Sequence, residues 1–323
     1  MSDHPIRPQA RTLIIPFAAS DEPGCRAQWA QLDLPHLRHW LARAHVVHTD
    51  HGDAYQLSPP HERARARALG WPATPDGTLP WAAWEAGRPN VPCAWFTPCH
   101  WQTGMEQVLL QGLDTRDWHD AESQALLAAL APFCAEDGIA LVYEAPDRWR
   151  AEGECLRDLP CASLDRVLGR RIDPWLLSAS GQPAQRTLLR LMNEAQMLFY
   201  THPVNDARGA RGLPLANGLW ISASGVWPGQ DGDGDDAATV QVLEALRPAA
   251  LAGDWTAWAR AWASLDAGPL ASALDNSPDL TLVLCGEQHA VQWAPAPPAR
   301  GWRALWPGGR GRPPALTSVL EAL

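Results

Sequence analysis

The apolar residues of this chain gather in short runs that predict buried strands. The first run, at 12–18, is rich in β-branched residues and is interrupted by Pro16. Residues 91–111 predict a proline-broken segment followed by a strand. Further strands are expected at 139–143, 218–223 and 280–285.

Amphipathic stretches between these runs predict helices. The clearest covers 183–200, where apolar residues recur at the spacing of one helix face, and Pro203 is expected to stop it. Residues 26–44 also have helical spacing, and Pro35 predicts two short helices there. The remaining helices are expected at 121–134, with Asp120 as its N-cap, and at 240–246 and 255–265.

Because helices and strands alternate, we predict an α/β fold with a mostly parallel central sheet flanked by helices. The length of 323 residues allows one large domain or two smaller ones. We expect a first α/β half at 1–172 and a second at 173–294, both within one compact domain. A tail at 295–323 is rich in Pro, Gly, Arg and Trp, and its part at 295–314 is expected to be weakly structured.

The composition, with 46% hydrophobic and 19% charged residues, is typical of a globular protein. No apolar run approaches the roughly 18–20 residues that a membrane span needs, so no membrane association is expected. The polar start lacks a secretory signal pattern, which predicts a cytoplasmic location. The seven cysteines form no CxxC pair, so neither a zinc knuckle nor a thioredoxin-type motif is expected.

Two compositional features narrow the classes of function. The chain has no lysine, which excludes a Walker A phosphate loop, a Schiff-base enzyme and a kinase-type phosphate lysine. It has 18 tryptophans against four Phe and three Tyr, which indicates packing by indole rings, with base or sugar stacking as the alternative. The net charge of −10 argues against a nucleic-acid partner.

Two segments carry metal-ligand residue types. One lies around 45–53, and the other follows the last predicted strand. The weak metal candidates are His48, Asp50, His51, Glu287 and His289. The acidic run at 231–236 lacks the Gly and Glu that an EF-hand requires, so we expect a solvated loop. No cofactor is expected, and manganese or zinc is the alternative.

The most distinctive segment is 193–225, where the helix at 183–200 runs into a proline-terminated turn. Arg208 and Arg211 are three residues apart, so one helical turn would point both guanidiniums the same way. The guanidinium fork binds phosphate and carboxylate groups bidentately. We therefore predict that a small phosphorylated or carboxylated ligand binds His202, Asn205, Arg208, Arg211 and Asn217. The alternative is that the arginines pair with acids such as Glu194, Asp206 and Asp165 to brace the turn.

The same segment resembles a known family signature. The run 202–205 (HPVN), followed by Arg208, 211–212 (RG) and 215–217 (LAN), is similar to a run of the archaeal-type cofactor-independent phosphoglycerate mutases. Those enzymes belong to the alkaline phosphatase superfamily, so the resemblance implies an alkaline-phosphatase-like fold. Over most of its length the chain resembles RpfE-type bacterial regulatory proteins, through segments at 97–101, 136–141, 162–170 and 193–214.

The chain departs from the mutases where their metal ligands and serine nucleophile belong. Their first strand ends in an Asp-Gly pair, whereas here it continues as 16–18 (PFA). Their late strand ends in a Thr-x-Asp-His-Gly pattern, whereas here 285–289 is CGEQH. The resemblance therefore implies a catalytically degenerate mutase-like protein, a pseudoenzyme that binds its ligand in a regulatory role. The alternatives are an active metal-dependent mutase or phosphatase, and a protein-interaction protein using the tail at 293–314.

Overall fold

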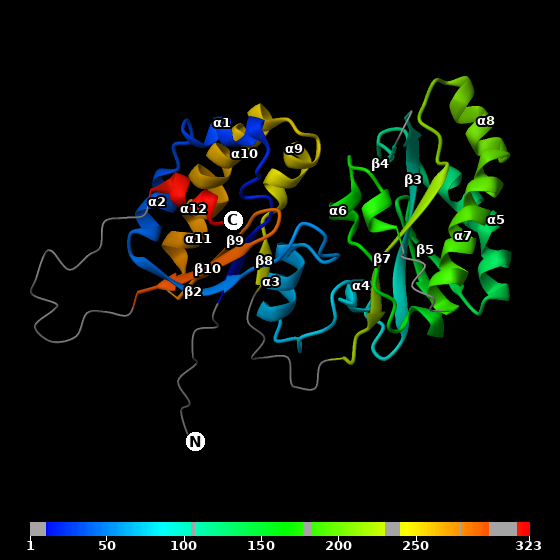
Figure 1. The fold of residues 1–323 in the computed structure, drawn as a ribbon, viewed down its shortest axis with the longest axis horizontal. Helices are drawn as coiled ribbons and strands as arrows, with labels where there is room; N and C mark the ends of the chain where they lie inside the picture. The colour runs from blue at the N-terminus through cyan, green and yellow to red at the C-terminus, as the bar shows by residue number, and fades with distance from the viewer. Residues whose placement is uncertain (1–10, 105–106, 177–182, 230–239, 278, 297–314) are drawn as a thin grey trace, which may run out of the picture. The chain divides into compact units, whose positions relative to one another are not determined.

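The computed structural model describes residues 11–104, 107–176, 183–229, 240–277, 279–296 and 315–323. The chain divides into two compact units (Figure 1). The first unit comprises 1–54, 59–73 and 232–323, and the second comprises 55–58 and 74–231. These units divide the chain at other places than the predicted halves, because the first unit joins both ends of the chain.

The first unit is built on a mixed sheet with the strand order β2-β10-β9-β1-β8. The neighbours β8 and β9 both run parallel to β1, whereas β10 is antiparallel to both β9 and β2. A parallel centre is therefore present, but the sheet is not mostly parallel as predicted. The strands are β1 (Thr12–Ile15), β2 (Ala44–Asp50), β8 (Val240–Val242), β9 (Thr281–Cys285) and β10 (Ala290–Pro295).

Helices cover both faces of this sheet. Leu13 and Ile15 point to one face and Ile14 to the other, as alternation along a strand requires. The helix α3 (Pro60–Ala68) packs on the Ile14 face through Ala64. The opposite face is covered by α1 (Pro23–Trp29), α2 (Pro35–Leu41), α9 (Arg247–Leu251), α10 (Trp255–Leu265), α11 (Ala271–Asn276) and α12 (Leu316–Glu321).

The helix α2 receives its N-terminal cap from a distant part of the chain. Its own N-cap residue, Leu34, has no side-chain acceptor. Asp266, which is 1% exposed at the start of the π-helical turn Asp266–Leu270, accepts the amides of His36 at 3.1 Å and Leu37 at 2.8 Å. One buried carboxylate thus satisfies two free helix amides and ties the two segments together.

Replacing Asp266 with alanine is expected to lower the free energy of unfolding by about 2 kcal/mol, the upper range for a lost cap. Urea denaturation measures this loss. Asp33→Ala is the control, because Asp33 lies beside α2 but is exposed and pairs with Arg38 only at 3.8 Å. A loss in Asp266→Ala no larger than that of the control would contradict a capping role.

The second unit contains a sheet whose strands all pair antiparallel with one another. Its order is β4-β3-β6-β5, and β7 also pairs with β3. The prediction of a mostly parallel sheet is therefore wrong for this unit, because hairpins and return segments link its strands. The strands are β3 (Pro92–Thr103), β4 (Val108–Gln111), β5 (Ala140–Ala145), β6 (Arg148–Glu152) and β7 (Gly218–Val226).

Two long helices build the main core of the second unit. Leu126 and Leu130 of α5 (Asp120–Glu136) and Leu188 of α7 (Pro183–Tyr200) are fully buried against the sheet. A smaller hydrophobic cluster around Trp95 packs the other face of the sheet against α4 (Trp81–Glu85). The remaining elements are α6 (Leu164–Val167), α8 (Pro203–Ala210) and the 3-10 turns Glu154–Leu156, Asp173–Trp175 and, in the first unit, Glu244–Leu246.

Several predicted elements differ from the structure for local reasons. The prolines at 91–111 do not break the strand β3. Pro98 pairs with β7, and it lies between the part of β3 that pairs with β6 and the part that pairs with β4. Residues 240–246 form the strand β8 and a 3-10 turn instead of a helix, because Val240 and Val242 pair with β1. Asp120 is the first residue of α5, and His119 precedes it as the N-cap.

Other predictions are confirmed. Pro35 does separate two helices, and the helix at 183–200 has the predicted bounds. The strands expected near 12–18 and 280–285 are present as β1 and β9. None of the described helices is long and apolar enough to cross a membrane. Most of the tail, and the acidic run at 231–236, lie outside the described residues.

Candidate functional site

The five predicted ligand-binding residues lie together around α8, and their polar groups bond within the chain. His202 is the N-cap of α8 and accepts the amide of Val204 through Nδ1 at 3.2 Å. The Asn205 side chain, 2% exposed, donates to the Phe199 and Ala216 carbonyls and accepts the Ala216 amide. Asn217 accepts the amide of Trp101 at 2.7 Å and donates to its carbonyl at 3.2 Å.

The two arginines of this cluster occupy different environments. The Arg208 side chain is 0% exposed. It donates to the carbonyls of Pro214 and Asp117 and to the carboxylates of Asp117 and Glu122, at 2.7–3.2 Å. Its guanidinium also lies 5.1 Å from the Trp118 ring centroid. Arg211 is 48% exposed and pairs with the other oxygen of Glu122.

An oxyanion that approached Arg208 would have to displace two carboxylates and two carbonyls from a buried guanidinium. The geometry therefore favours a bracing role for Arg208, with Glu122 and Asp117 as its acids. Of the expected acids, Glu194 pairs instead with Arg190 at 2.6 Å. Ligand binding by the five residues stays a prediction, and Arg211 is the exposed cation on which it can be tested.

The predicted metal candidates do not form the ligand set of a metal centre. Asp50 pairs with Arg63 at 2.9 Å and lies 3.9 Å from Arg67, so its charge is already neutralised. The rings of His51 and His289 meet edge to face at 5.3 Å, and His289 Nδ1 accepts the Gly52 amide. His48 lies exposed on β2, and Glu287 accepts a hydrogen bond from Ser20. Within the described parts of the chain, no three His, Cys, Asp or Glu side chains are grouped to hold a metal ion.

A strained turn follows β1 at its carboxyl end. Phe17 has φ 56°, a conformation that bulky side chains rarely adopt and that costs about 1–3 kcal/mol. Two buried tryptophans of α10 hold the turn, because Trp258 donates to the Phe17 carbonyl at 2.8 Å and Trp262 donates to the Ala18 carbonyl at 3.2 Å. The Ala18 amide donates to the backbone carbonyl of Cys285, at the end of β9, over 2.8 Å. The turn is thus fixed to α10 and β9 before the chain reaches Ala19.

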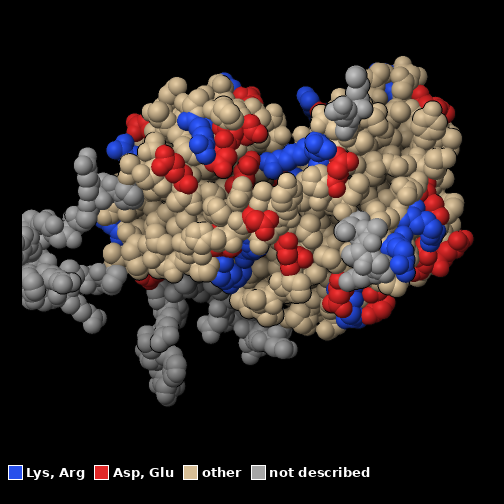
Figure 2. Space-filling model, in the orientation of Figure 1, with Lys and Arg blue, Asp and Glu red and all other residues tan. Residues whose placement is uncertain are grey.

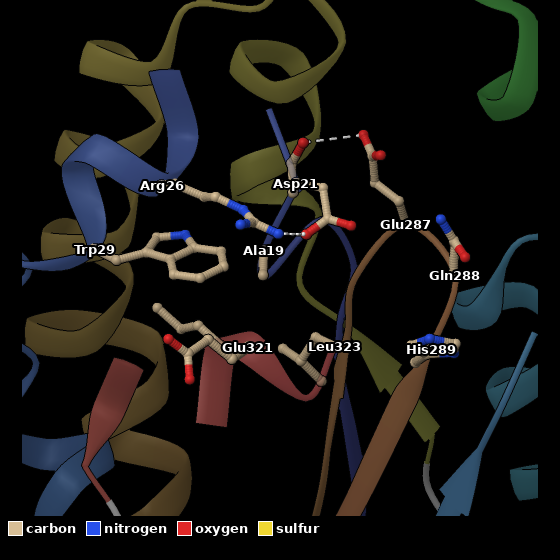
Figure 3. A pocket seen from close by; sticks show the side chains of 11 residues that line it. Ala19, Asp21, Arg26, Trp29, Glu287, Gln288, His289, Glu321 and Leu323 are labelled. Atoms are coloured by element: carbon tan, nitrogen blue, oxygen red, sulfur yellow. Dashed lines mark hydrogen bonds and ion pairs between the residues drawn. The ribbon is translucent and has the colours of Figure 1, made fainter. Parts of the chain in front are cut away.

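A pocket of about 190 Å³ opens next to this turn, at the carboxyl ends of the parallel strands β1 and β9 (Figure 3). In α/β folds, this end of the parallel strands is where ligands bind. Residues after β1, on α1, between β9 and β10, and on or after α12 line it. Its polar and aromatic members include Ser20, Asp21, Arg26, Trp29, Glu287, His289 and Glu321.

The pocket combines one cation with several carboxylates. Arg26 pairs with Asp21 at 2.6 Å, and its guanidinium lies 5.7 Å from the Trp29 ring centroid. The pKa of Arg26 is raised by its hydrogen bond to Asp21, and the charge of Glu321 adds to this effect. Ser20 donates to Glu287 at 3.1 Å. Arginines elsewhere on the face shown in Figure 2 also lie beside Asp and Glu side chains.

The thiol beside the pocket has the properties of a packing residue. Cys25 on α1 is fully buried, and burial raises its pKa above the ordinary value. Burial likewise raises the pKa of Cys134 and Cys161 to about 12. Because the thiolate is the nucleophilic form, these environments suppress cysteine reactivity.

Sequence reasoning did not single out Ser20, Asp21 or Arg26. They belong to no motif, and their distance from Glu287 along the chain hides their proximity in space. The pairing of β1 with β9 brings them together, and that pairing has no local signal in the sequence. Of the pocket residues, only Glu287 and His289 stand out in the sequence, as metal-ligand types after the last predicted strand.

Comparisons with known proteins give distant structural similarities. No family model and no curated protein sequence matches the chain. A cofactor-independent phosphoglycerate mutase from Thermoplasma acidophilum is 13% identical, with a TM-score of 0.39 over 96% of this chain and 95% of that chain. The PH0037 protein from Pyrococcus horikoshii is 12% identical, with a TM-score of 0.44 over 90% and 89%.

Both TM-scores lie below 0.5, and neither similarity assigns an activity. The RpfE-type resemblance has no counterpart among these comparisons and stays a prediction.

Proposed function

We propose that this chain is a phosphoglycerate-mutase-like protein without mutase catalysis that binds a small carboxylated or phosphorylated ligand in a regulatory role. The ligand site is the pocket at the carboxyl ends of β1 and β9. The observation that carries the proposal is the position of Arg26 at this pocket, beside a strained turn that two tryptophans hold in place.

Arg26 suits an oxyanion better than Arg208 does. Its present partner Asp21 has a side chain that is 71% exposed, and the Arg26 side chain is 58% exposed. Exposed ion pairs are worth only about 0–1 kcal/mol, so a ligand carboxylate or phosphate could replace Asp21 at little cost. The guanidinium fork would then bind the ligand with two parallel hydrogen bonds.

The absence of mutase catalysis is proposed from the residues at the strand ends. The turn after β1 presents apolar Phe17 and Ala18 where the mutases carry an acid. The carbonyls of both residues are held by tryptophans, so this backbone is fixed in its present form. Asp50, a carboxylate of the predicted metal set, is committed to arginines.

Thermal denaturation with four carboxylate probes tests the proposed function: glycerate, 3-phosphoglycerate, serine and O-phosphoserine. A ligand that binds only the native state at about 100 times its Kd stabilises it by about 2.7 kcal/mol. At least one probe is expected to raise the melting temperature, and Arg26→Gln is expected to abolish the rise. Arg38→Gln, on the neighbouring helix and similarly exposed, is expected to retain it.

Two outcomes would overturn the proposal. One is a melting temperature that none of the four probes changes. The other is a shift that survives Arg26→Gln but is lost in Arg211→Gln, which would move the site to the cluster around α8. Conversion of 3-phosphoglycerate to 2-phosphoglycerate, tested with and without manganese, would show an active mutase instead of a degenerate one.

A further inference from the structure

The charges lining the pocket restrict the class of ligand beyond a simple anion. Three carboxylates, those of Asp21, Glu287 and Glu321, and one guanidinium line it. These four charged side chains together carry two net negative charges. A ligand with only negative groups would meet Arg26 but would be repelled by the remaining carboxylates.

The charges are also separated within the pocket. Figure 3 shows Arg26 and Trp29, both from α1, on one side, and Glu287 and His289, from the β9–β10 turn, on the other. The Glu287 carboxylate is oriented by the hydroxyl of Ser20, which donates to its Oε1 at 3.1 Å. Ser20 in turn accepts the Glu22 amide at 3.2 Å. A hydrogen-bonded chain through Ser20 therefore helps to position the acidic side of the pocket.

We propose that the pocket binds a small zwitterion of the amino-acid type, whose carboxylate or phosphate pairs with Arg26 and whose ammonium group pairs with Glu287. This inference rests on the proposed function and names the class of ligand at the same site. Both ligand charges then meet an opposite charge, and the ammonium offsets the repulsion that the acidic lining exerts on a plain anion.

The size of the pocket agrees with this class. Its volume of about 190 Å³ is far above the roughly 10–15 Å³ that a cavity needs to hold one water molecule. That space accommodates an amino acid with a short side chain. The apolar part of such a ligand would meet Ala19, Leu320 and the Trp29 ring, which also line the pocket.

Glycerate with serine, and 3-phosphoglycerate with O-phosphoserine, form two matched pairs that isolate the effect of the ammonium group. Serine differs from glycerate, and O-phosphoserine from 3-phosphoglycerate, by an ammonium group in place of a hydroxyl. Isothermal titration calorimetry on the full chain is expected to show that the amino member of each pair binds at least about tenfold more tightly. One hydrogen bond to a charged group contributes enough free energy for this difference in affinity. This comparison uses the unmodified protein and does not depend on the folding of a variant.

Glu287→Gln tests the residue assigned to the ammonium group. The glutamine keeps an acceptor for Ser20 but removes the charge, so the preference for the amino member is expected to disappear. Glu244→Gln, at an exposed position of the same unit, is the control and is expected to leave the preference unchanged.

The outcomes separate this inference from the proposed function. If glycerate and 3-phosphoglycerate bind as tightly as serine and O-phosphoserine, or more tightly, the proposal of a zwitterionic ligand is overturned. The proposed function would then still stand. A preference for the amino members that survives Glu287→Gln would overturn the assignment of Glu287. Binding of none of the four probes would overturn the proposed function and this inference with it.

Discussion

Replacing Arg208 with alanine is expected to lower the free energy of unfolding by about 3–5 kcal/mol, the cost of removing one member of a buried ion pair. The side chain is 0% exposed and donates to two carbonyls and two carboxylates. Its loss would leave the partly buried Glu122 and Asp117 facing a cavity next to Trp118. Urea denaturation followed by tryptophan fluorescence measures the change.

Arg211→Ala is the matched control for this prediction. Arg211 lies one turn away on the same segment and pairs with the same Glu122, but it is 48% exposed. Exposed ion pairs contribute about 0–1 kcal/mol, so the variant is expected to lose no more than that. Equal effects of the two substitutions would show that Arg208 is not the brace that its contacts indicate.

The difference between Arg208 and Arg211 also shows what the signature at 202–217 does not reveal about its side chains. The sequence correctly places His202, Asn205 and Arg208 close together, because one short helix carries them. The direction in which each donor points depends on Asp117 and Glu122, which precede Arg208 by 91 and 86 residues. No local pattern reveals those partners, so a ligand-binding cluster and an internal brace look alike in the sequence.

The same limit applies to the fold. Periodicity along one segment predicts α7 and α10 well, because a helix is defined by contacts within a few residues. The three residues of β8 are too short for a pattern, and they become a strand by pairing with β1, which lies more than 220 residues away. Strand direction has the same origin, so the mixed and antiparallel sheets could not be distinguished from a parallel one.

The tryptophans, whose role the composition left open, take part in holding the pocket. Trp258 and Trp262 lie on one face of α10, are 0% exposed and meet edge to face at 6.4 Å. Each donates its indole N–H to a carbonyl of the turn after β1. They therefore combine core packing with a hydrogen bond that fixes backbone conformation, which a phenylalanine could not do.

Trp258→Ala is accordingly expected to lower the free energy of unfolding by about 3–5 kcal/mol, the usual cost of truncating a buried tryptophan. Trp258→Phe keeps most of the ring and removes the donor to Phe17. An unsatisfied buried carbonyl costs about 1–3 kcal/mol, so the phenylalanine variant is expected to lose about that much. Urea denaturation of both variants separates ring volume from the hydrogen bond.

Trp255→Phe is the control, because Trp255 lies one turn earlier on α10 and is only partly buried. If the indole of Trp258 holds the turn for the ligand, Trp258→Phe should also weaken the binding of any carboxylate probe that Arg26 recognises. Because Ala19 and Ser20 follow the turn directly and line the pocket, release of the Phe17 carbonyl would change the wall that the ligand meets. Lower stability with unchanged probe affinity would mean that Trp258 supports the core and that the strained turn does not shape the site.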